Sequence, residues 1–227
     1  MPEKQFCVIF LWETLCKKNM IFWKMLTKIL LRVHNALYRV ISFAAIKAEN
    51  GVHPKHRLLG YHHFFLQHLN ATDSVLDIGC GNGSLTRDLA KKAKRVVGID
   101  CKEKYIAQAK KNNGAANIEY VLGDVVVYDF REKFDVLVLS NVLEHIEKRK
   151  EFLQKIKPIA NRFLIRVPML NRDWLTVYKK EMGVEYRLDK THFIEYTLQD
   201  IEQELNQVGF QIKDYFIQYG EIWIIAN

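Results

Sequence analysis

His192 and Glu195 are spaced three residues apart, and Tyr196 follows them directly. Histidine titrates near neutral pH, and a histidine oriented by a carboxylate is the type of group that takes a proton from a hydroxyl. His145, which follows an apolar run, is a second candidate. The alternative for these residues is capping or packing. The spacing therefore favours His192, Glu195 and His145 as catalytic residues acting on a hydroxyl.

A glycine-rich turn lies in residues 75–85, which read VLDIGCGNGSL. Gly79, Gly81 and Gly83 alternate after a short apolar run that contains Asp77, and helix-forming residues follow. Glycine allows a ligand to approach the backbone closely, because it has no Cβ. The spacing fits neither the dinucleotide fingerprint nor the phosphate loop with its Gly-Lys-Ser/Thr ending. The pattern predicts a strand, a ligand-binding turn and a helix.

Three further apolar runs end in polar residues. RVVGID ends at Asp100, NIEYVLGD ends at Asp124, and FDVLVLSNVLEHI runs into Ser140 and Asn141. Parallel strands bring their carboxyl ends to one edge of a sheet, where ligands of such folds bind. The sequence therefore predicts a binding site built from successive strand ends.

With these four segments in order, residues 74–227 resemble the class I, Rossmann-like S-adenosylmethionine-dependent methyltransferases of the small-molecule type. The resemblance implies that Asp100 receives the two ribose hydroxyls of S-adenosylmethionine and that Asp124 lies near the adenine amino group. It further implies cofactor contacts from the strand ends and turns, namely Asp77, Gly79, Cys80, Gly81, Cys101, Val125, Ser140 and Asn141. In this family the helix before the first strand closes over the methionine end, which favours Arg57 and Tyr61. An exposed arginine and a packed tyrosine are the alternative.

The alternation of strand and helix predicts an α/β fold with a doubly wound, seven-stranded, mainly parallel sheet and an N-terminal helical extension. We place the extension at residues 1–70 and the methyltransferase domain at residues 71–227. Strands are expected near 74–79, 95–100, 117–123, 134–140, 160–167, 210–217 and 221–226, with the last two joined as a hairpin around Gly220. Helices are expected near 55–69, 84–93, 102–112, 147–157 and 197–208.

Residues 168–196 are too long for an ordinary connection and are rich in aromatic and charged side chains. We interpret this segment as a lid that binds the acceptor. Stacking and forked hydrogen bonds suit a sugar or an anionic group. The candidates on and around the lid are Arg166, Arg172, Trp174, Tyr178, Lys179, Tyr186, Arg187, Tyr196, Glu221 and Trp223, although about half of such residues would merely solvate a surface.

The net charge of +8 is concentrated at the N-terminus, since residues 1–66 hold ten basic and three acidic side chains. Residues 21–48 read as a helix with a basic stripe along a wide apolar face. That face packs on its own domain or a dimer partner, or lies on an anionic membrane surface. Residues 1–19 contain an apolar run too short to span a bilayer, and Met20 is an alternative start. The four cysteines form no C-x-x-C pair, which favours a reduced, cytoplasmic setting.

No metal site is predicted. The histidines at 53, 56, 62 and 63 lack a nearby cysteine or carboxylate cluster, and adjacent histidines on a helix point in different directions.

These observations predict an S-adenosylmethionine-dependent methyltransferase for a small-molecule acceptor, at an oxygen of a saccharide, a lipid-linked intermediate or another cell-envelope metabolite. Two alternatives remain open. A nucleic-acid methyltransferase is disfavoured, because residues after the fourth strand lack the Asn/Asp-Pro-Pro-Tyr/Phe sequence and there is no Pro-Cys nucleophile. The other alternative is a regulatory protein that binds the cofactor without transferring its methyl group.

Overall fold

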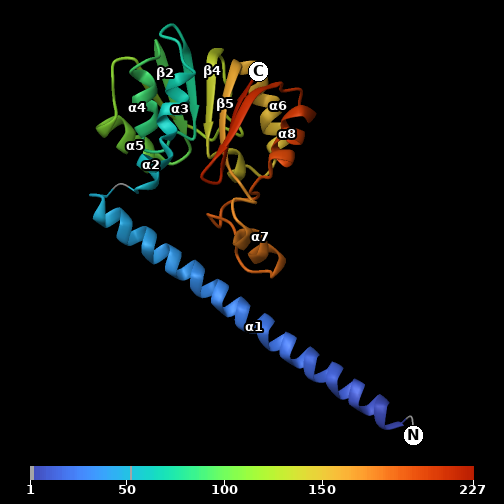
Figure 1. Cartoon of the computed structure of the whole chain (residues 1–227). Coiled ribbons are helices and arrows are strands. Elements are labelled where there is room, and N and C mark those ends of the chain that lie inside the picture. The colour runs from blue at the N-terminus through green and yellow to red at the C-terminus, as the bar shows by residue number, and fades with distance from the viewer. Residues whose placement is uncertain (1–2, 52) are drawn as a thin grey trace. The chain divides into compact units, whose positions relative to one another are not determined.

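A seven-stranded sheet forms the centre of the fold (Figure 1). The computed structural model describes residues 3–51 and 53–227, with side chains from residue 19 onward. The strand order is β3-β2-β1-β4-β5-β7-β6; the first five strands run parallel, and β7 runs antiparallel to both neighbours. The mainly parallel sheet predicted from the sequence is thereby confirmed. The strands are β1 (Ser74–Ile78), β2 (Arg95–Asp100), β3 (Ile118–Leu122), β4 (Phe134–Ser140), β5 (Ala160–Pro168), β6 (Ile212–Gln218) and β7 (Glu221–Ala226).

Helices connect the strands and cover both faces of the sheet (Figure 1). Most bounds differ by no more than three residues from those expected, because the apolar runs end at polar or glycine residues. The helices are α1 (Glu3–Ala48), α2 (Lys55–Leu59), α3 (Tyr61–Gln67), α4 (Ser84–Ala90), α5 (Glu103–Asn112), α6 (Arg149–Ile156), α7 (Trp174–Glu181) and α8 (Leu198–Gln207), with the 3-10 helices η1 (Leu143–His145) and η2 (Lys157–Ile159).

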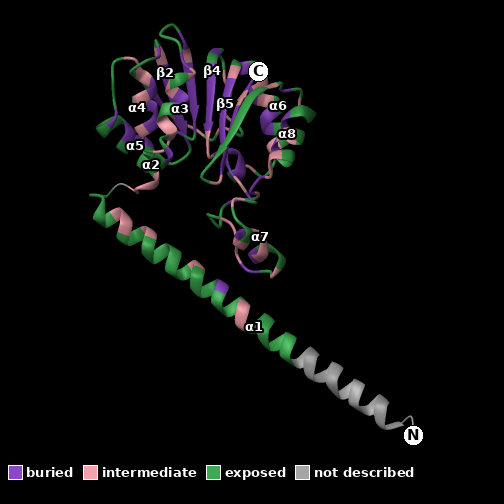
Figure 2. Cartoon of the chain, in the orientation of Figure 1, coloured by how far each residue is buried: buried purple, intermediate pink, exposed green. Residues whose placement is uncertain are grey.

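The two faces of the sheet are built by the alternation of side chains along each strand. In β1, Val75 belongs to a cluster with α3 and α4, whereas Leu76 and Ile78 belong to a larger cluster with α6 and α8. All three side chains are almost completely buried. Figure 2 shows the buried residues concentrated in the strands and on the inner sides of the helices. The core therefore holds the carboxyl ends of the strands in fixed register.

The hairpin between β6 and β7 closes the antiparallel edge of the sheet. Tyr219 and Gly220 both have positive φ, at 50° and 74°. Two consecutive residues of this kind suit the twist of a two-residue hairpin. The turn predicted around Gly220 is thus confirmed, and it places Glu221 at the start of β7.

The single helix expected over residues 55–69 is wrong, because the chain forms two short helices instead. Gly60 separates α2 from α3 with a left-handed φ of 55°. A helix cannot continue through that conformation. Phe65 and Leu69 are buried against the sheet. This packing explains why the structure assigns α2 and α3 to the same compact unit as the sheet, whereas the sequence placed the boundary at residue 70.

The chain divides into two compact units, residues 55–174 with 187–227, and residues 1–54 with 175–186. In the second unit, part of the segment interpreted as a lid packs on α1. Asn35 Nδ2 donates to the carbonyl of Glu185 at 2.6 Å, and Lys179 Nζ lies 3.1 Å from His34 Nδ1. Helix α7 and this pairing were not predicted, because they depend on contacts between residues about 150 positions apart.

Helix α1 is longer than the 28 residues expected at 21–48, since it extends from Glu3 to Ala48. Residues 19–48 of this helix are long and apolar enough to cross a membrane. Most of their large apolar side chains are exposed, including Trp23 at 61% and Ile41 at 65%, while Leu31 is buried. The expectations for residues 1–18 concern side chains outside the described part of the structure.

Candidate cofactor and acceptor site

The turn after β1 is shaped by glycine. A Cβ added to Gly83, whose φ is 79°, would lie 2.3 Å from the hydroxyl oxygen of Tyr120, so no other residue fits there. The N–H groups of Gly79 and Cys80 both donate to the carbonyl of Ile99, at 2.8 and 3.1 Å. These bonds tie the turn to the end of β2. The turn and the second strand end therefore form one rigid edge.

Asp100 at the end of β2 is held in place by two backbone donors. Its Oδ2 accepts from the N–H of Gly81 at 3.0 Å, and its Oδ1 accepts from the N–H of Lys102 at 2.8 Å. Each carboxylate oxygen can accept a further hydrogen bond. The position beside the glycine turn is the one that the resemblance implies for the group binding the ribose hydroxyls.

Asp77 is buried in β1 and accepts a hydrogen bond of 2.6 Å from the hydroxyl of Thr86. Burial raises the pKa of Asp77 to about 7, the Thr86 bond opposes that rise, and the charge of Asp100 adds to it. A buried carboxyl at the ligand edge is suited to a polar partner that arrives with the cofactor. Its predicted role in cofactor binding stays a prediction.

The remaining predicted cofactor residues differ in exposure. Asp124 is exposed, and its Oδ1 accepts from the N–H of Val126 at 3.0 Å, which fixes the turn after β3. Val125 is half-buried, and Cys101 is exposed. Cys80 is buried, and burial raises the pKa of its thiol. All four lie on the turns at the carboxyl ends of β1, β2 and β3, as the sequence predicts.

Asn141, directly after Ser140 at the end of β4, links this edge to β5. Its backbone has a left-handed φ of 56°. Its N–H donates to the carbonyl of Arg166 at 2.9 Å, and its Oδ1 accepts from Arg166 Nε at 2.9 Å. Asn141 thus orients the Arg166 side chain.

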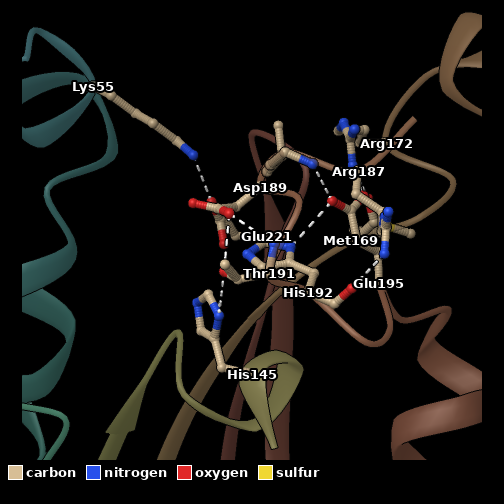
Figure 3. Close-up of polar contacts among 11 residues, drawn as sticks. Lys55, His145, Met169, Arg172, Arg187, Asp189, Thr191, His192, Glu195 and Glu221 are labelled. Atoms are coloured by element: carbon tan, nitrogen blue, oxygen red, sulfur yellow. Dashed lines mark hydrogen bonds and ion pairs between the residues drawn. The ribbon is translucent and has the colours of Figure 1, made fainter. Parts of the chain in front are cut away.

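Arg166 and Glu221, both predicted to bind the acceptor, form a buried ion pair with an Nε to Oε2 distance of 3.6 Å. Arg166 is 7% exposed, and Glu221 is fully buried. The guanidinium lies over the rings of Tyr61 at 4.3 Å and Trp223 at 5.4 Å. Lys55 Nζ donates to Glu221 Oε1 at 2.8 Å (Figure 3). We call Arg166, Glu221 and Lys55 the buried polar centre; it lies beneath the edge of the sheet where the carboxyl ends of the parallel strands meet.

Arg57 and Tyr61, predicted at the methionine end of the cofactor, lie on the two short helices. Tyr61 contributes its ring to the Arg166 contact, and its hydroxyl lies 2.6 Å from His56 Nδ1. Burial raises the pKa of Tyr61, and Arg166 opposes the rise. Arg57 is exposed on α2. The structure therefore couples Tyr61 to the buried polar centre and leaves Arg57 on the surface.

His192 and Glu195 meet as the sequence predicts, with 3.3 Å between His192 Nδ1 and Glu195 Oε1 (Figure 3). Arg172 and the N–H of Leu188 also donate to Glu195. Burial would raise the pKa of Glu195, but these three hydrogen bonds hold it below its ordinary value. Arg187 Nη1 donates to the carbonyl of His192 at 2.8 Å. Two of the predicted acceptor-binding arginines therefore position this pair.

His145 belongs to the same group, because its ring meets the His192 ring edge-on at 4.7 Å. His145 Nδ1 lies 2.9 Å from the hydroxyl of Thr191, which in turn donates to Asp189 Oδ1 at 2.8 Å (Figure 3). Burial lowers the pKa of His145, and the nearby His192 lowers it further. The three predicted catalytic residues are thus brought together, and their catalytic roles stay predictions.

Glu144 is a residue of this site that the sequence analysis missed. It has no exposed surface, and neither carboxylate oxygen has a hydrogen-bond partner among the described residues. Burial raises the pKa of Glu144 to about 8, and the charges of Glu221 and Glu195 act in the same direction. The only signal for it in the sequence is its place in the Leu-Glu-His segment, where the pattern predicts a role for His145 alone.

Three predicted acceptor residues have other surroundings. Tyr196 is fully buried, and its hydroxyl donates to Glu204 Oε1 at 2.9 Å, so it packs in the core and its contact with the acceptor stays a prediction. Trp174 is 74% exposed at the start of α7. Tyr178 lies on α7, in the compact unit that contains α1. The roles of Trp174 and Tyr178 stay predictions.

Residues 75–161 match the family model described as a methyltransferase domain. A ubiquinone biosynthesis O-methyltransferase of Bradyrhizobium diazoefficiens is 35% identical over 120 residues, covering 50% of this chain and 46% of that protein. The chain spans about half the length of the curated relatives it matches first.

Solved structures show the same fold. The N-methyltransferase NodS from Bradyrhizobium japonicum, in complex with S-adenosyl-L-homocysteine, has a TM-score of 0.57 at 16% identity over 74% of this chain and 85% of that one. Magnesium protoporphyrin IX methyltransferase from Synechocystis, also with bound S-adenosyl-L-homocysteine, has a TM-score of 0.57 at 22% identity over 74% and 83%. Residues 75–161 are therefore a methyltransferase domain of the class I, S-adenosylmethionine-dependent type. The predicted family resemblance and cofactor class are confirmed.

Proposed function

We propose that this protein transfers the methyl group of S-adenosylmethionine to a hydroxyl oxygen of a small molecule. One observation carries the proposal. The glycine turn and the fixed Asp100 carboxylate lie at one edge of the sheet, and η1, which follows β4 at that edge, ends at His145. His145 in turn contacts His192. A hydroxyl acceptor must lose its proton as the new bond forms. Histidines grouped near the edge of the sheet that binds the cofactor are suited to removing this proton. The O-methyltransferase name of the curated relatives supports oxygen as the acceptor atom.

The acceptor we propose is a lipid-linked intermediate, a saccharide or another metabolite of the cell envelope. The lid segment carries aromatic and arginine side chains for stacking and forked hydrogen bonds. The name of the relatives refers to ubiquinone biosynthesis, which favours a lipid-borne hydroxyl within this class.

The full chain is expected to bind S-adenosylmethionine and S-adenosyl-L-homocysteine in calorimetry, and to release the latter when a suitable acceptor is added. Transfer of labelled methyl from the cofactor would be followed over two sets of acceptors, prenylated phenols and saccharides with free hydroxyls. Release of the label as methyl iodide on heating the product with hydriodic acid would locate the methyl on oxygen. Absence of heat with either nucleoside would refute the proposal, and label on a ring carbon would refute the acceptor atom.

We also propose that α1 brings the protein to an anionic membrane surface. Residues 19–48 hold five basic side chains and no acidic one, beside the exposed apolar face described above. Apolar side chains enter the boundary of the headgroups, while basic side chains pair with anionic lipids. The partner that fits this combination is a bilayer containing phosphatidylglycerol or a similar lipid. In this setting the protein is cytoplasmic and membrane-associated.

Replacing Lys24, Lys28 and Arg32 together by glutamine is expected to lower partitioning onto anionic vesicles by about 100-fold, since each basic residue near such a surface contributes about 1 kcal/mol. Sedimentation with vesicles of neutral and of anionic composition measures this partitioning. The matched control replaces Lys104, Lys110 and Lys111 on α5, which are also exposed. Equal loss in the control would contradict the proposal, as would a concentration-dependent dimer with no pelleting, which would assign the face to a second copy.

A further inference from the structure

Glu144, His145 and His192 together present three groups that bind metals. One ligand atom from each lies within 4.8 Å of the others. Glu144 and His145 belong to η1, directly after β4, and His192 comes from the segment before α8. One carboxylate and two imidazoles form a donor set used for Zn²⁺ and other first-row divalent cations, with a further position left for water or substrate.

The hydrogen bonds of both histidines use Nδ1 and leave Nε2 available. Thr191 donates its only hydroxyl hydrogen to Asp189, so it accepts from His145 Nδ1–H. Glu195 also accepts from Arg172 and from the N–H of Leu188, so this carboxylate is an acceptor and takes the hydrogen of His192 Nδ1–H. In both rings Nε2 then carries the lone pair. Metal-binding histidines are held in this way, with the other ring nitrogen donating to an oxygen.

The buried carboxylate of Glu144 gives independent support. It has no exposed surface, and its two oxygens have no hydrogen-bond partner among the described residues. Buried carboxylates in folded proteins are normally paired, hydrogen-bonded or bound to a metal. A cation at this cluster would offset the loss of solvation at Glu144. His145 is exposed, so the cluster is open to solvent on that side.

We propose that Glu144, His145 and His192 bind a divalent transition-metal cation of the Zn²⁺ or Mn²⁺ type that takes the acceptor hydroxyl in its open position. This role rests on the proposed function. The cation lowers the pKa of the bound hydroxyl, whose proton leaves to water. The oxygen then forms its bond to the methyl carbon while the sulfur keeps the electron pair of the broken C–S bond. In this arrangement the two histidines act on the acceptor proton through the bound cation.

The test titrates ZnCl₂ and MnCl₂ separately into the full-length protein, after metal removal with a chelator, and follows binding by calorimetry. One site per chain is expected. Glu144→Gln and His192→Gln are each expected to weaken binding by at least tenfold. Pulsed electron paramagnetic resonance of the Mn²⁺ form should show coupling to histidine nitrogen that decreases in His192→Gln. The melting temperature should rise when metal is added to the wild type and stay unchanged when it is added to Glu144→Gln.

The matched control is His63→Gln, which removes an exposed histidine on α3. Metal affinity in this variant should equal that of the wild type. If Glu144→Gln fails to fold, His145→Gln serves instead, because that side chain is exposed. Wild-type affinity in the ligand variants, equal weakening in the control, or no nitrogen coupling would each overturn the inference. Methyl transfer by metal-free protein would overturn it while leaving the proposed function intact, whereas metal binding without cofactor binding would refute only the proposed function.

Discussion

Replacing Asp100 by alanine is expected to weaken binding of S-adenosylmethionine by about 100-fold or more. The carboxylate is positioned by the N–H groups of Gly81 and Lys102, so both of its oxygens are fixed before the cofactor arrives. Hydrogen bonds to a charged group contribute about 1.5–3 kcal/mol each, and the loss of two ribose contacts therefore corresponds to at least this factor. Calorimetric titration with S-adenosyl-L-homocysteine measures the change without the need for an acceptor.

The matched control for this experiment is Asp214→Ala on the edge strand β6. Asp214 also accepts a backbone N–H, from Tyr215 at 2.8 Å, but it is exposed and lies on the antiparallel part of the sheet. Its replacement should leave cofactor affinity unchanged. Asp100→Asn should give an intermediate loss, because one side-chain oxygen can still accept. Cofactor affinity in Asp100→Ala within threefold of the wild type would show that the ribose is bound elsewhere.

The sequence predicted the sheet well because its central strands β1, β2, β4 and β5 are buried on both faces. A nearly continuous apolar run such as residues 134–140 is buried on both faces only when helices cover both sides of the sheet. This run ends where the polar residues Ser140 and Asn141 begin. The positions of Asp77, Asp100 and Asn141 at one edge follow directly from parallel strands. Local pattern and global fold agree in this part of the chain.

Features that depend on contacts across the sequence were missed. Gly60 looked compatible with one helix, and only the packing of Phe65 and Leu69 shows why the chain breaks there. Tyr196 looked like a ligand-facing aromatic, but its hydroxyl has a partner eight residues away in α8. Glu144 was overlooked because burial without a partner is a property of the folded chain alone.

Replacing His192 by alanine is expected to lower turnover by about 100-fold or more while cofactor affinity stays unchanged. His192 acts on the acceptor proton, directly or through a bound cation, and groups in this role contribute about 10²–10⁴-fold to the rate. Single-turnover transfer of labelled methyl with saturating cofactor isolates this step. His63→Gln, on the exposed side of α3, is the matched control and should keep full turnover.

Glu195 acts through His192, so the two substitutions are not expected to add. Glu195 fixes the His192 ring by the Nδ1 contact at 3.3 Å and is itself held by Arg172. When His192 has been replaced by alanine, Glu195 has no imidazole ring left to orient, so its removal should have no further effect on turnover. The double variant His192→Ala with Glu195→Gln should therefore lose no more turnover than His192→Ala alone, as is found for residues that work as a unit. If the two losses multiplied instead, Glu195 would have a separate role in binding or in stability, which melting curves of the single variant would then separate.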